Sequence, residues 1–418
     1  MRRVLYISYD GVLEPLGQSQ ILSYLDGLAA DHAITLLTFE KPADLSDRVA
    51  VAALESRLAA RGITWVRLRY HKRPPVFSTA FDTAVGILHA RRVCRQRHVA
   101  IVHARGYVPS LIALAARGRS RAAFLFDMRG FWVDEKIDAG HWRRHGILHR
   151  VGKWCERWFF RSADGIVSLT AAGVRAFPDL GYNPAAAKPV PIVVIPTCVA
   201  LDRFTPGEKD RQLEASLGLA GARVIGCVGT MSNWYLRQEM LRYLARASES
   251  IGNMRILIVT REDQDVLRRD ARVCGVPMDR LVVTRAAFVD MPHMMRLFDV
   301  GVFFIQPSYS KQGSAATKLA EFLAAGVPVV INDGVGDSGE IVRRGRVGLV
   351  LSSLDEAAIA RSMPELEMLL ADPQIGSRCR QVAVERFDLN QGIEQYRDLY
   401  RRLAGGRDEA LSASAGGG

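Results

Sequence analysis

Short runs of β-branched and other apolar residues alternate with amphipathic segments along the first half of the chain. This alternation predicts a parallel β-sheet covered by helices, because parallel strands are joined by crossover connections that are usually helical. The predicted strands are residues 4–9, 34–39, 64–68, 101–104, 123–127 and 165–169, and the predicted helices include residues 18–30 and 50–61.

A proline-rich passage at residues 182–196 interrupts this rhythm around a short predicted strand, 190–195. Proline lacks a backbone N–H and excludes helix, so the passage is the best candidate for a domain boundary. The alternation then restarts and predicts a second doubly wound sheet. Its predicted strands are residues 224–228, 255–260, 281–284, 300–305 and 327–331, and its predicted helices are residues 239–250, 263–274, 291–298 and 317–325.

The chain of 418 residues exceeds the length that one hydrophobic core usually supports, so two domains are expected. We predict an α/β protein with two Rossmann-like, doubly wound domains facing each other across a cleft, since open α/β sheets bind ligands at the carboxyl ends of their strands. The predicted parts are a first domain at 1–197, a second domain at 198–385, a helix at 386–404 that crosses back to the first domain, and a disordered tail at 405–418.

The positive charge of the chain is concentrated in its first half. Residues 1–200 hold 28 Lys and Arg against 16 Asp and Glu, whereas residues 201–418 hold 28 against 28. A one-sided basic domain indicates an anionic partner, such as a lipid surface, nucleic acid or an acidic polymer, unless the charge serves only solubility. None of the usual nucleic-acid recognition signatures occurs, so no nucleic acid is expected.

The six cysteines are scattered without a Cys-x-x-Cys pair, which predicts neither a disulfide framework nor a zinc site and fits a reducing cytoplasm. The basic start at residues 1–3 is followed by a β-branched run that Asp10 interrupts, so these residues predict a strand rather than a signal peptide. No apolar run reaches the length that spans a bilayer. We therefore expect a cytoplasmic protein with peripheral contact at the inner face of the membrane through its basic first domain.

The stretch at residues 314–330 carries the most specific chemical pattern. Ser314 or Thr317 can cap a helix whose free N–H groups form an anion site. Lys318 adds a cation in the first turn, where it is unfavourable unless an anion is bound. Glu321, one turn further, is placed to accept hydrogen bonds from sugar hydroxyls such as those of a ribose. The alternative is a capped amphipathic helix with a solvated Lys–Glu pair.

This stretch resembles the donor-binding helix of GT-B glycosyltransferases of family 4, which often read Ser-Pro-Thr-Lys-x-x-Glu-x-x-Ala-x-Gly-x-Pro-Val. The other matches are the first loop at residues 9–20, the acceptor-domain motifs His103-Ala104-Arg105 and Phe126 to Trp132, the interdomain signature Ile195 to Val199 before Asp202 and Phe204, and the loop Gly334 to Asp337. The resemblance implies the GT-B architecture and a retaining, metal-independent sugar transfer in bacterial glycan synthesis.

Two features depart from the pattern of the family. Many members carry an earlier glutamate, with seven residues between it and the position of Glu321, but here that position is Gly313. The expected sugar contact is then absent or comes from Gln312 or another group. Many members also carry an Arg and a Lys soon after the glycine that opens the second domain, whereas residues 229–235 contain neither. Lys318 must therefore carry more of the phosphate charge.

The resemblance assigns residues to a donor side and to an acceptor side. The leaving diphosphate is expected at the helix N-terminus, at Lys318 and at the backbone of the Gly17 loop. The donor-side prediction, for a UDP- or GDP-linked sugar, is Gly17, Gln18, Gly229, Thr230, Ser314, Ala316, Thr317, Lys318 and Glu321. The acceptor-side prediction is Asp10, Arg105, Asp127, Arg129 and Trp132.

The residues predicted to take part in the reaction are Lys318, Glu321, His103, Asp127 and Arg129. Lys318 would hold the phosphate, supplemented by Arg129 or Arg105. His103 and Asp127 are alternatives for orienting the acceptor or for base work, beside the donor phosphate itself. Equally, Asp127 can be a strand-end carboxylate that pairs with Arg129, and His103 can be a packing residue.

Two patterns imitate metal sites, and neither is expected to bind metal. Asp263 and Asp265 repeat the Asp-x-Asp motif of the other major glycosyltransferase fold, but they lie in the first turn of a predicted helix, where carboxylates complement the helix dipole. His141, His145 and His149 share a helical face, yet arginines crowd that segment and no carboxylate or cysteine completes a set. We expect no metal and no cofactor beyond the nucleotide sugar.

The segment at residues 141–161 mixes tryptophans with basic residues, as interfacial helices do. One interpretation is that it docks on anionic lipid. The other is that its Trp and Phe residues are core and only the arginines are outside, because Trp154, Trp158 and Arg161 share helical spacing.

The leading prediction is a glycosyltransferase that moves a sugar from a nucleotide diphosphate sugar onto a lipid-linked or glycan acceptor with retention of configuration. One alternative is a nucleotide-sugar 2-epimerase, which would need acid/base carboxylates in the cleft and no separate acceptor. Another is a catalytically degenerate, membrane-associated subunit of a glycan assembly complex, suggested by Gly313 and by the missing Arg and Lys. The acceptor-side motif with Asp127 and Arg129 favours transfer over epimerisation.

Overall fold

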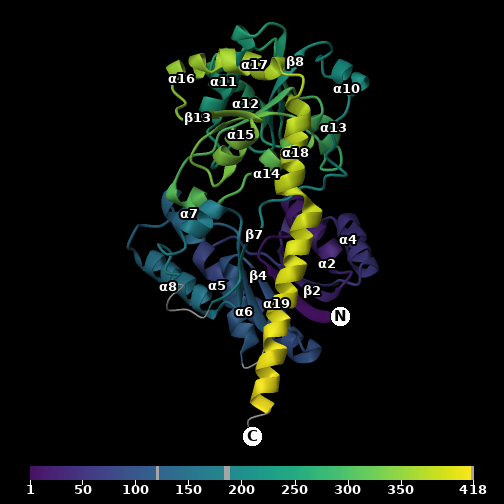
Figure 1. Ribbon diagram of the computed structural model, residues 1–418, viewed down its shortest axis with the longest axis vertical. Helices are drawn as coiled ribbons and strands as arrows, with labels where there is room; N and C mark the ends of the chain where they lie inside the picture. The colour runs from purple at the N-terminus through teal and green to yellow at the C-terminus, as the bar shows by residue number, and fades with distance from the viewer. Residues whose placement is uncertain (119–121, 183–188, 416–418) are drawn as a thin grey trace. The chain divides into compact units, whose positions relative to one another are not determined.

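The chain forms two compact units, each built on its own β-sheet (Figure 1). The computed structural model describes residues 1–118, 122–182 and 189–415, with side chains described up to residue 404. Unit 1 consists of residues 1–196 and the chain from Leu389 onward, and unit 2 consists of Thr197–Asp388. The C-terminal helix is therefore part of unit 1.

Unit 1 contains a seven-stranded, fully parallel sheet. Its strands are β1 (Arg2–Ser8), β2 (His32–Glu40), β3 (Thr64–Arg69), β4 (Ile101–Arg105), β5 (Ala123–Met128), β6 (Gly165–Ser168) and β7 (Ile192–Val194). They lie in the order β3-β2-β1-β4-β5-β6-β7. The order reverses between β1 and β4, so the carboxyl ends of these two strands form the topological switch point, where sheets of this kind bind ligands.

Helices cover both faces of this sheet. They are α1 (Pro15–Gly17), the π-helical turn η1 (Gln18–Leu22), α2 (Ser23–Leu28), α3 (Pro42–Ser46), α4 (Arg48–Ala60), α5 (Pro75–Arg97), α6 (Tyr107–Arg117), α7 (Trp132–Asp138), α8 (Ile147–Ser162), α9 (Ala171–Arg175) and α19 (Leu389–Ala415). Right-handed crossovers place α2 and α4 on one face and α5, α6 and α8 on the other. The helix α5 packs on α6, and α6 packs on α8. The helix α19 packs against α2 and β4 and so completes the first face.

Unit 2 repeats this arrangement with a six-stranded, fully parallel sheet. Its strands are β8 (Arg223–Val228), β9 (Met254–Val259), β10 (Leu281–Thr284), β11 (Val300–Phe303), β12 (Val329–Asn332) and β13 (Gly348–Leu351), in the order β10-β9-β8-β11-β12-β13. Its helices are α10 (Arg211–Ser216), α11 (Arg237–Ser250), α12 (Gln264–Val273), α13 (Met291–Met295), the 3-10 turn η2 (Tyr309–Gly313), α14 (Thr317–Ala324), α15 (Ser338–Gly345), α16 (Glu356–Arg361), α17 (Met363–Ala371) and α18 (Ile375–Phe387). The switch point of this sheet lies at the carboxyl ends of β8 and β11.

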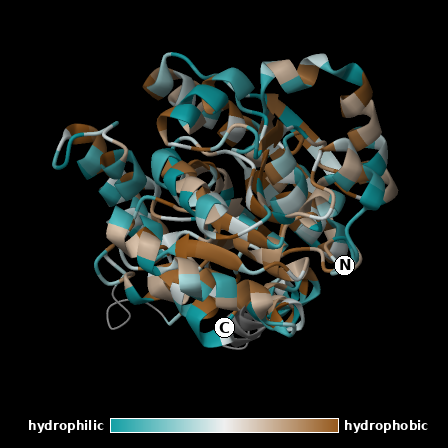
Figure 2. Cartoon of the chain, turned by 90° about the horizontal axis from the view of Figure 1, so that it is seen from above, coloured by the Kyte–Doolittle hydropathy of each residue, from teal (hydrophilic) through white to brown (hydrophobic). Residues whose placement is uncertain are grey.

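Apolar side chains fill the space between the sheets and the helices. In Figure 2 the strands are largely brown and the helices alternate between brown and teal, as amphipathic helices on a sheet do. The packing in unit 2 is close enough to require a glycine. A Cβ at Gly301 of β11 would lie 2.6 Å from the ring of Phe322 in α14. The close contact holds α14 against the strand that borders the switch point.

The predicted fold class, an α/β protein with two Rossmann-like sheets, is confirmed. Every predicted strand is present, with its ends within two residues of the expected positions. The sequence did not predict β13, a four-residue strand that begins with glycine and is too short for a periodic signal. Among the described helices, none combines the length and the apolar composition that a bilayer-spanning segment needs.

Two predictions concern parts of the chain that the structure describes incompletely. The unit boundary falls between Pro196 and Thr197, at the end of the proline-rich passage, of which residues 183–188 lie outside the described residues. The helix α19 begins at Leu389, and its helical backbone continues to Ala415, where the sequence suggested no regular structure. Residues 416–418 lie outside the described residues, and the disorder of the tail stays a prediction.

Candidate functional site

Lys318 lies at the switch point of unit 2, in the first turn of α14. Its side chain is 7% exposed, and its Nζ donates a hydrogen bond to the carbonyl oxygen of Thr230, 2.8 Å away in the loop after β8. The ammonium group also lies 3.6 Å from the ring centre of Tyr235 in the same loop. A buried cation thus joins the loop after β8 to the helix after β11.

The helix N-terminus beside Lys318 has no side-chain cap. The helix α14 begins at Thr317 with Ala316 at the N-cap position, and no described side chain accepts a hydrogen bond there. The predicted capping by Ser314 or Thr317 is therefore wrong, because the cap position is occupied by alanine, whose side chain has no hydrogen-bond acceptor. The free N–H groups and their partial positive charge are suited to an anion.

Burial shifts the proton equilibria of the two ionisable residues of α14. It lowers the pKa of Lys318 to about 8 and raises the pKa of Glu321, one turn along the same helix, to about 7, because both charged forms lose contact with water. Functional sites typically contain neighbouring groups whose pKa values are shifted in opposite directions, toward neutral pH. A bound anion would favour the charged form of Lys318.

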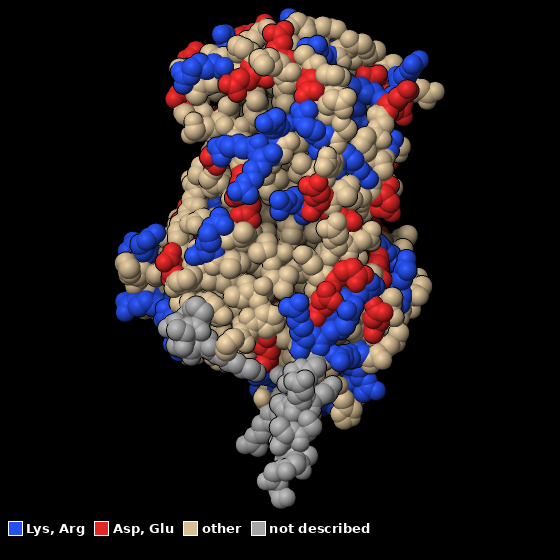
Figure 3. Space-filling view, in the orientation of Figure 1, with Lys and Arg blue, Asp and Glu red and all other residues tan. Residues whose placement is uncertain are grey.

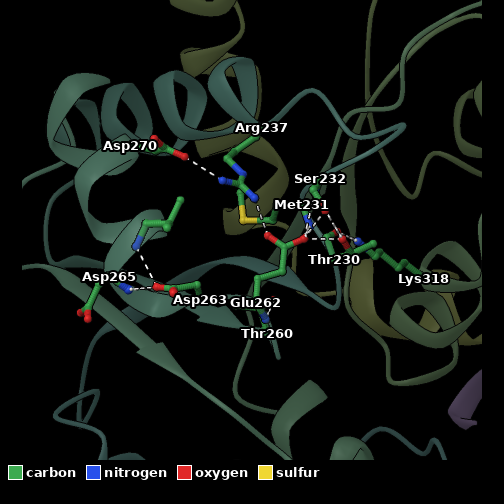
Figure 4. Close-up of polar contacts among 11 residues, drawn as sticks. Thr230, Met231, Ser232, Arg237, Thr260, Glu262, Asp263, Asp265, Asp270 and Lys318 are labelled. Atoms are coloured by element: carbon green, nitrogen blue, oxygen red, sulfur yellow. Dashed lines mark hydrogen bonds and ion pairs between the residues drawn. The ribbon is translucent and has the colours of Figure 1, made fainter. Parts of the chain in front are cut away.

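A carboxylate that the sequence analysis did not identify holds the loop after β8 (Figure 4). Glu262 follows β9, and its Oε1 accepts hydrogen bonds from the backbone N–H groups of Met231 at 3.1 Å and Ser232 at 3.0 Å. The hydroxyls of Thr230 and Ser232 donate to the same oxygen. Burial alone would raise the pKa of Glu262, but the hydrogen bonds from Ser232 and Thr230 hold it below its usual value. Glu262 thereby fixes the backbone whose carbonyl accepts from the buried lysine.

In unit 1, too, a carboxylate at the switch point accepts hydrogen bonds from the backbone of the first loop. Glu40 ends β2, is fully buried, and accepts hydrogen bonds from the backbone N–H groups of Val12 at 3.0 Å and Leu13 at 3.2 Å in the loop after β1. A Cβ at Gly11 would lie 2.5 Å from Oε2 of Glu40, so the carboxylate also requires a glycine. In both units, a carboxylate at or just after the end of the strand beside the central one holds the N–H groups of the first loop.

A second buried lysine borders the loop after β8. Lys311 lies in η2, and its Nζ is 3.7 Å from the ring centre of Trp234. Gly229 opens the loop with a φ of 76°, and a Cβ there would lie 3.3 Å from Cε of Lys318. Residues 229–235 contain no Lys or Arg. The two lysines beside this loop, Lys311 and Lys318, come from the segment after β11 and lie against the rings of Trp234 and Tyr235.

In unit 1, the predicted residues His103 and Asp127 form a buried hydrogen-bond network with α19. The Nε2 of His103 lies 3.2 Å from Oδ2 of Asp127, and its Nδ1 lies 2.7 Å from the hydroxyl of Tyr400. The hydroxyl of Tyr396 donates to the same Oδ2 at 3.1 Å. Burial lowers the pKa of His103, so the ring is neutral, and its hydrogen lies on Nε2 because a carboxylate only accepts. Both ring nitrogens are thus occupied inside the fold.

Two arginines lie beside this network. Arg105 ends β4 and is 7% exposed, and Arg129 forms an ion pair with Oδ1 of Asp127 at 3.6 Å. The Nε atoms of both arginines are buried without a hydrogen-bond partner among the described residues. Arg105 pairs with Ser8 of β1 and with Asp127 of β5 in the sheet, at the carboxyl ends of the strands. The two arginines therefore lie at the switch point. Two guanidinium groups against one carboxylate leave a net positive site that an anionic group would complete.

The other predicted residues of unit 1 are engaged in local structure. A Cβ at Gly17 would lie 2.1 Å from the carbonyl oxygen of Gly11, so this glycine is explained by the packing of its own loop. Gln18 donates to a carbonyl of the same loop, and Asp10 is exposed. Trp132 begins α7 and packs against neighbouring aromatic rings. The structure thus brings Arg105, Asp127 and Arg129 together but leaves Asp10 and Trp132 apart from their hydrogen-bond network; their predicted roles in binding stay predictions.

The two patterns that imitate metal sites take part in local structure. Asp263 is the N-cap residue of α12, and its Oδ1 accepts from the N–H groups of Asp265 at 2.9 Å and Val266 at 3.0 Å. The ring of His149 accepts a hydrogen bond from the backbone of His145. Across the described residues, no group of three or more His, Cys, Asp or Glu side chains is arranged to hold a metal ion.

Replacing Asp127 with Asn should destabilise the protein, because Arg129 loses its counter-charge inside the fold. We expect the free energy of unfolding to fall by about 3 kcal/mol at neutral pH. Burial alone would raise the pKa of Asp127, but Arg129 and His103 lower it from 3.8 to about 2. The stabilisation by this carboxylate is therefore complete above about pH 4 and is lost as the pH falls through about 2. Chemical denaturation across this pH range measures both effects.

Asp398 provides a matched control for this experiment. It lies on α19 and pairs with Arg401 at 2.8 Å, but both side chains are exposed. Asp398→Asn should change the free energy of unfolding by less than about 0.5 kcal/mol. Equal effects of Asp127→Asn and Asp398→Asn would contradict the account of a buried charge network.

Comparison with protein families identifies both halves of the chain. Residues 18–198 match the Glycosyl transferase 4-like domain, and residues 222–367 match Glycosyl transferases group 1. A search of curated proteins by sequence found no match.

Solved structures with the same fold include sucrose-phosphate synthase from Thermosynechococcus elongatus, with 17% identity, a TM-score of 0.71, and coverage of 97% of this chain and 100% of that chain. The Anabaena protein HepE in complex with UDP-glucose has 17% identity and a TM-score of 0.69 over 99% of this chain and 100% of that chain. A glycosyltransferase from Rickettsia africae has 13% identity and a TM-score of 0.69 over 96% and 98%. With the two matched family models, this likeness in fold shows that the chain belongs to the GT-B glycosyltransferases of the family 4 type.

Proposed function

We propose that the chain transfers a sugar from a nucleotide diphosphate sugar to a lipid-linked or glycan acceptor, with retention of configuration and without a divalent metal. The observation that carries the proposal is the buried Lys318 at the uncapped N-terminus of α14, bonded to the carbonyl of Thr230. HepE was solved with UDP-glucose, and the shared fold supports a UDP-linked donor here, with GDP as the alternative. Retention is implied by the resemblance to family 4.

The groups around α14 suit a leaving diphosphate. Lys318 supplies a positive charge, and the first N–H groups of α14 supply hydrogen bonds. Lys311, buried in η2, adds a second positive charge beside the same loop. Glu321 would hold the ribose. Fixed protein charges and dipoles of this kind can stabilise a departing diphosphate as a divalent cation would, which supports a metal-independent reaction.

The groups of unit 1 favour an acceptor that carries a negative charge. The buried Nε atoms of Arg105 and Arg129 lack partners in the described chain, and the phosphate of a lipid-linked acceptor would provide them. His103 and Asp127 would act as positioning residues for these arginines. Because both nitrogens of His103 are already bonded, we propose that the acceptor proton passes to the departing donor phosphate instead.

Calorimetric titration with UDP, GDP and their sugars, without added metal, tests the donor site. We expect one nucleotide to bind the wild type and to bind Lys318→Ala at least about 100-fold more weakly, because a buried charge-assisted contact to phosphate is lost. Arg246→Ala, which removes a half-exposed cation on α11, should leave the affinity within about twofold. If no nucleotide binds the wild type, the transferase proposal fails and the degenerate-subunit alternative is favoured.

The affinity for UDP should be highest between about pH 7 and pH 8. Lys318 binds the diphosphate when protonated, so above its pKa of about 8 the Kd should rise by up to about tenfold per pH unit. Glu321 accepts ribose hydrogen bonds best as a carboxylate, so the Kd should also rise as the pH falls below about 7. Lys318→Ala should remove the alkaline limb and Glu321→Gln should weaken the acidic limb. An alkaline limb that persists in Lys318→Ala would refute the assignment.

Glu262 should affect nucleotide affinity by positioning the loop after β8. Glu262→Gln keeps the size of the side chain but loses its charge and one accepting oxygen, so we expect the Kd for UDP to rise by about tenfold. The matched control is Asp270→Asn, since Asp270 forms the other ion pair of Arg237 at 2.7 Å; the Kd should stay within about twofold. A purely structural role for Glu262 would lower the thermal midpoint and leave the Kd unchanged.

A further inference from the structure

Two helices of unit 1 expose large apolar side chains that nothing in the described chain covers. On α5 these are Val76, Phe77, Phe81 and Leu88, which are exposed by 51, 76, 57 and 66%. On α8 they are Ile147, Leu148, Val151 and Trp154, which are exposed by 78, 39, 54 and 58%. Single exposed apolar residues are common on protein surfaces, but two groups of this size mark an interaction surface.

The spacing within each group forms a stripe along its helix. Phe77, Phe81 and Leu88 recur at intervals that return to one side of a helix, as do Ile147, Val151 and Trp154. The sequence left open whether the aromatic residues of α8 face the core. The structure separates them: Phe159 and Phe160 are buried, whereas Trp154 lies outside with its ring 5.7 Å from that of Trp158.

Both stripes lie toward the same edge of unit 1. The helices α5 and α8 cover one face of the sheet with α6 between them. A helix that connects parallel strands runs antiparallel to them, so its N-terminal half lies at the carboxyl edge of the sheet. Except for Leu88, which lies just past the middle of α5, the exposed residues of α5 and α8 belong to these N-terminal halves. The edge is the one that carries Arg105 and Arg129.

The segments around the stripes contain more basic than acidic residues. Around the stripe of α5, residues 72–88 contain Lys72, Arg73 and one acidic residue, Asp82. Residues 141–161 contain six Lys and Arg and one acidic residue, Glu156; Lys153 of this segment forms ion pairs with Glu156 and with Asp134 of α7. The carboxylates of Asp82 and Glu156 are buried and accept hydrogen bonds inside the fold. On the face that Figure 3 shows, basic and acidic side chains are interspersed.

We propose that these two stripes and the arginines and lysines around them form one docking surface, the α5–α8 surface, for an anionic lipid membrane. The inference rests on the proposed lipid-linked acceptor and assigns the surface by which unit 1 reaches it. Aromatic and apolar side chains enter the boundary between headgroups and acyl chains, while Lys and Arg bind the anionic headgroups. A second copy of the chain fits this surface less well, because two such basic surfaces would repel each other.

Sedimentation with lipid vesicles tests the α5–α8 surface. The wild type should bind vesicles of phosphatidylcholine mixed with phosphatidylglycerol, bind them less at high salt, and bind phosphatidylcholine alone weakly. The double variant Phe77→Ser/Phe81→Ser and the variant Trp154→Ser should each lower the partition coefficient by at least about tenfold. Val273→Ser, which changes a residue 87% exposed on α12 of unit 2, should change it by less than about twofold.

Vesicle binding that survives both stripe variants would overturn the proposal. Equal binding of the wild type to neutral and anionic vesicles would overturn the assignment to anionic lipid. An oligomer in light scattering that the stripe variants dissociate, with vesicle binding unchanged, would show a protein interface instead. UDP titration separates this inference from the proposed function. Stripe variants that lose vesicle binding and keep the wild-type Kd support it, whereas a wild type that binds vesicles but no nucleotide refutes the transferase proposal alone.

Discussion

The first loop of each unit follows the central strand, β1 in unit 1 and β8 in unit 2. Its backbone N–H groups need acceptors, because the loop lies beyond the end of the strand and cannot continue the hydrogen bonds of the sheet. Glu40, at the end of β2, and Glu262, three residues after β9, supply the acceptors. A carboxylate that accepts several N–H bonds fixes the loop without covering the carboxyl edge of the sheet. The contact between Lys318 and the carbonyl of Thr230 depends on this fixed loop.

The two units carry different groups at the carboxyl edges of their sheets. In unit 2, a buried lysine with a lowered pKa lies beside uncapped helix N–H groups, which suits a ligand with concentrated negative charge. In unit 1, Asp127 and His103 hold two arginines whose Nε atoms lack partners in the described chain. Buried polar groups without a partner destabilise a fold unless a ligand completes them, so the two Nε atoms of unit 1 support the proposed anionic acceptor.

The periodic patterns of the sequence were sufficient to predict every strand of the two sheets except β13, and also the helix α14, because these features are local. Lys318 and Glu321 lie one turn apart on a helix that its own residues specify. The cap of that helix was predicted wrongly, since helix ends shift by a residue or two and Ala316, not Ser314 or Thr317, occupies the cap position.

The remaining parts of the site depend on contacts between distant segments. Tyr400 is 297 residues from His103, and no pattern near either residue indicates that they meet. Glu262 lies about thirty residues after the loop that it holds, in the short gap between a predicted strand and a predicted helix. Helical spacing alone also could not decide the orientation of α8, because both its tryptophan side and its phenylalanine side are apolar.

A crystal structure with UDP bound would test the central claim most directly, because it locates the diphosphate relative to Lys318. The account predicts a phosphate oxygen within about 4 Å of the Nζ of Lys318 and beside the first N–H groups of α14, a distance typical of an ion pair. It also predicts that Glu262 still accepts from Met231 and Ser232. A diphosphate bound away from Lys318, or one that displaces Glu262 from those N–H groups, would contradict it.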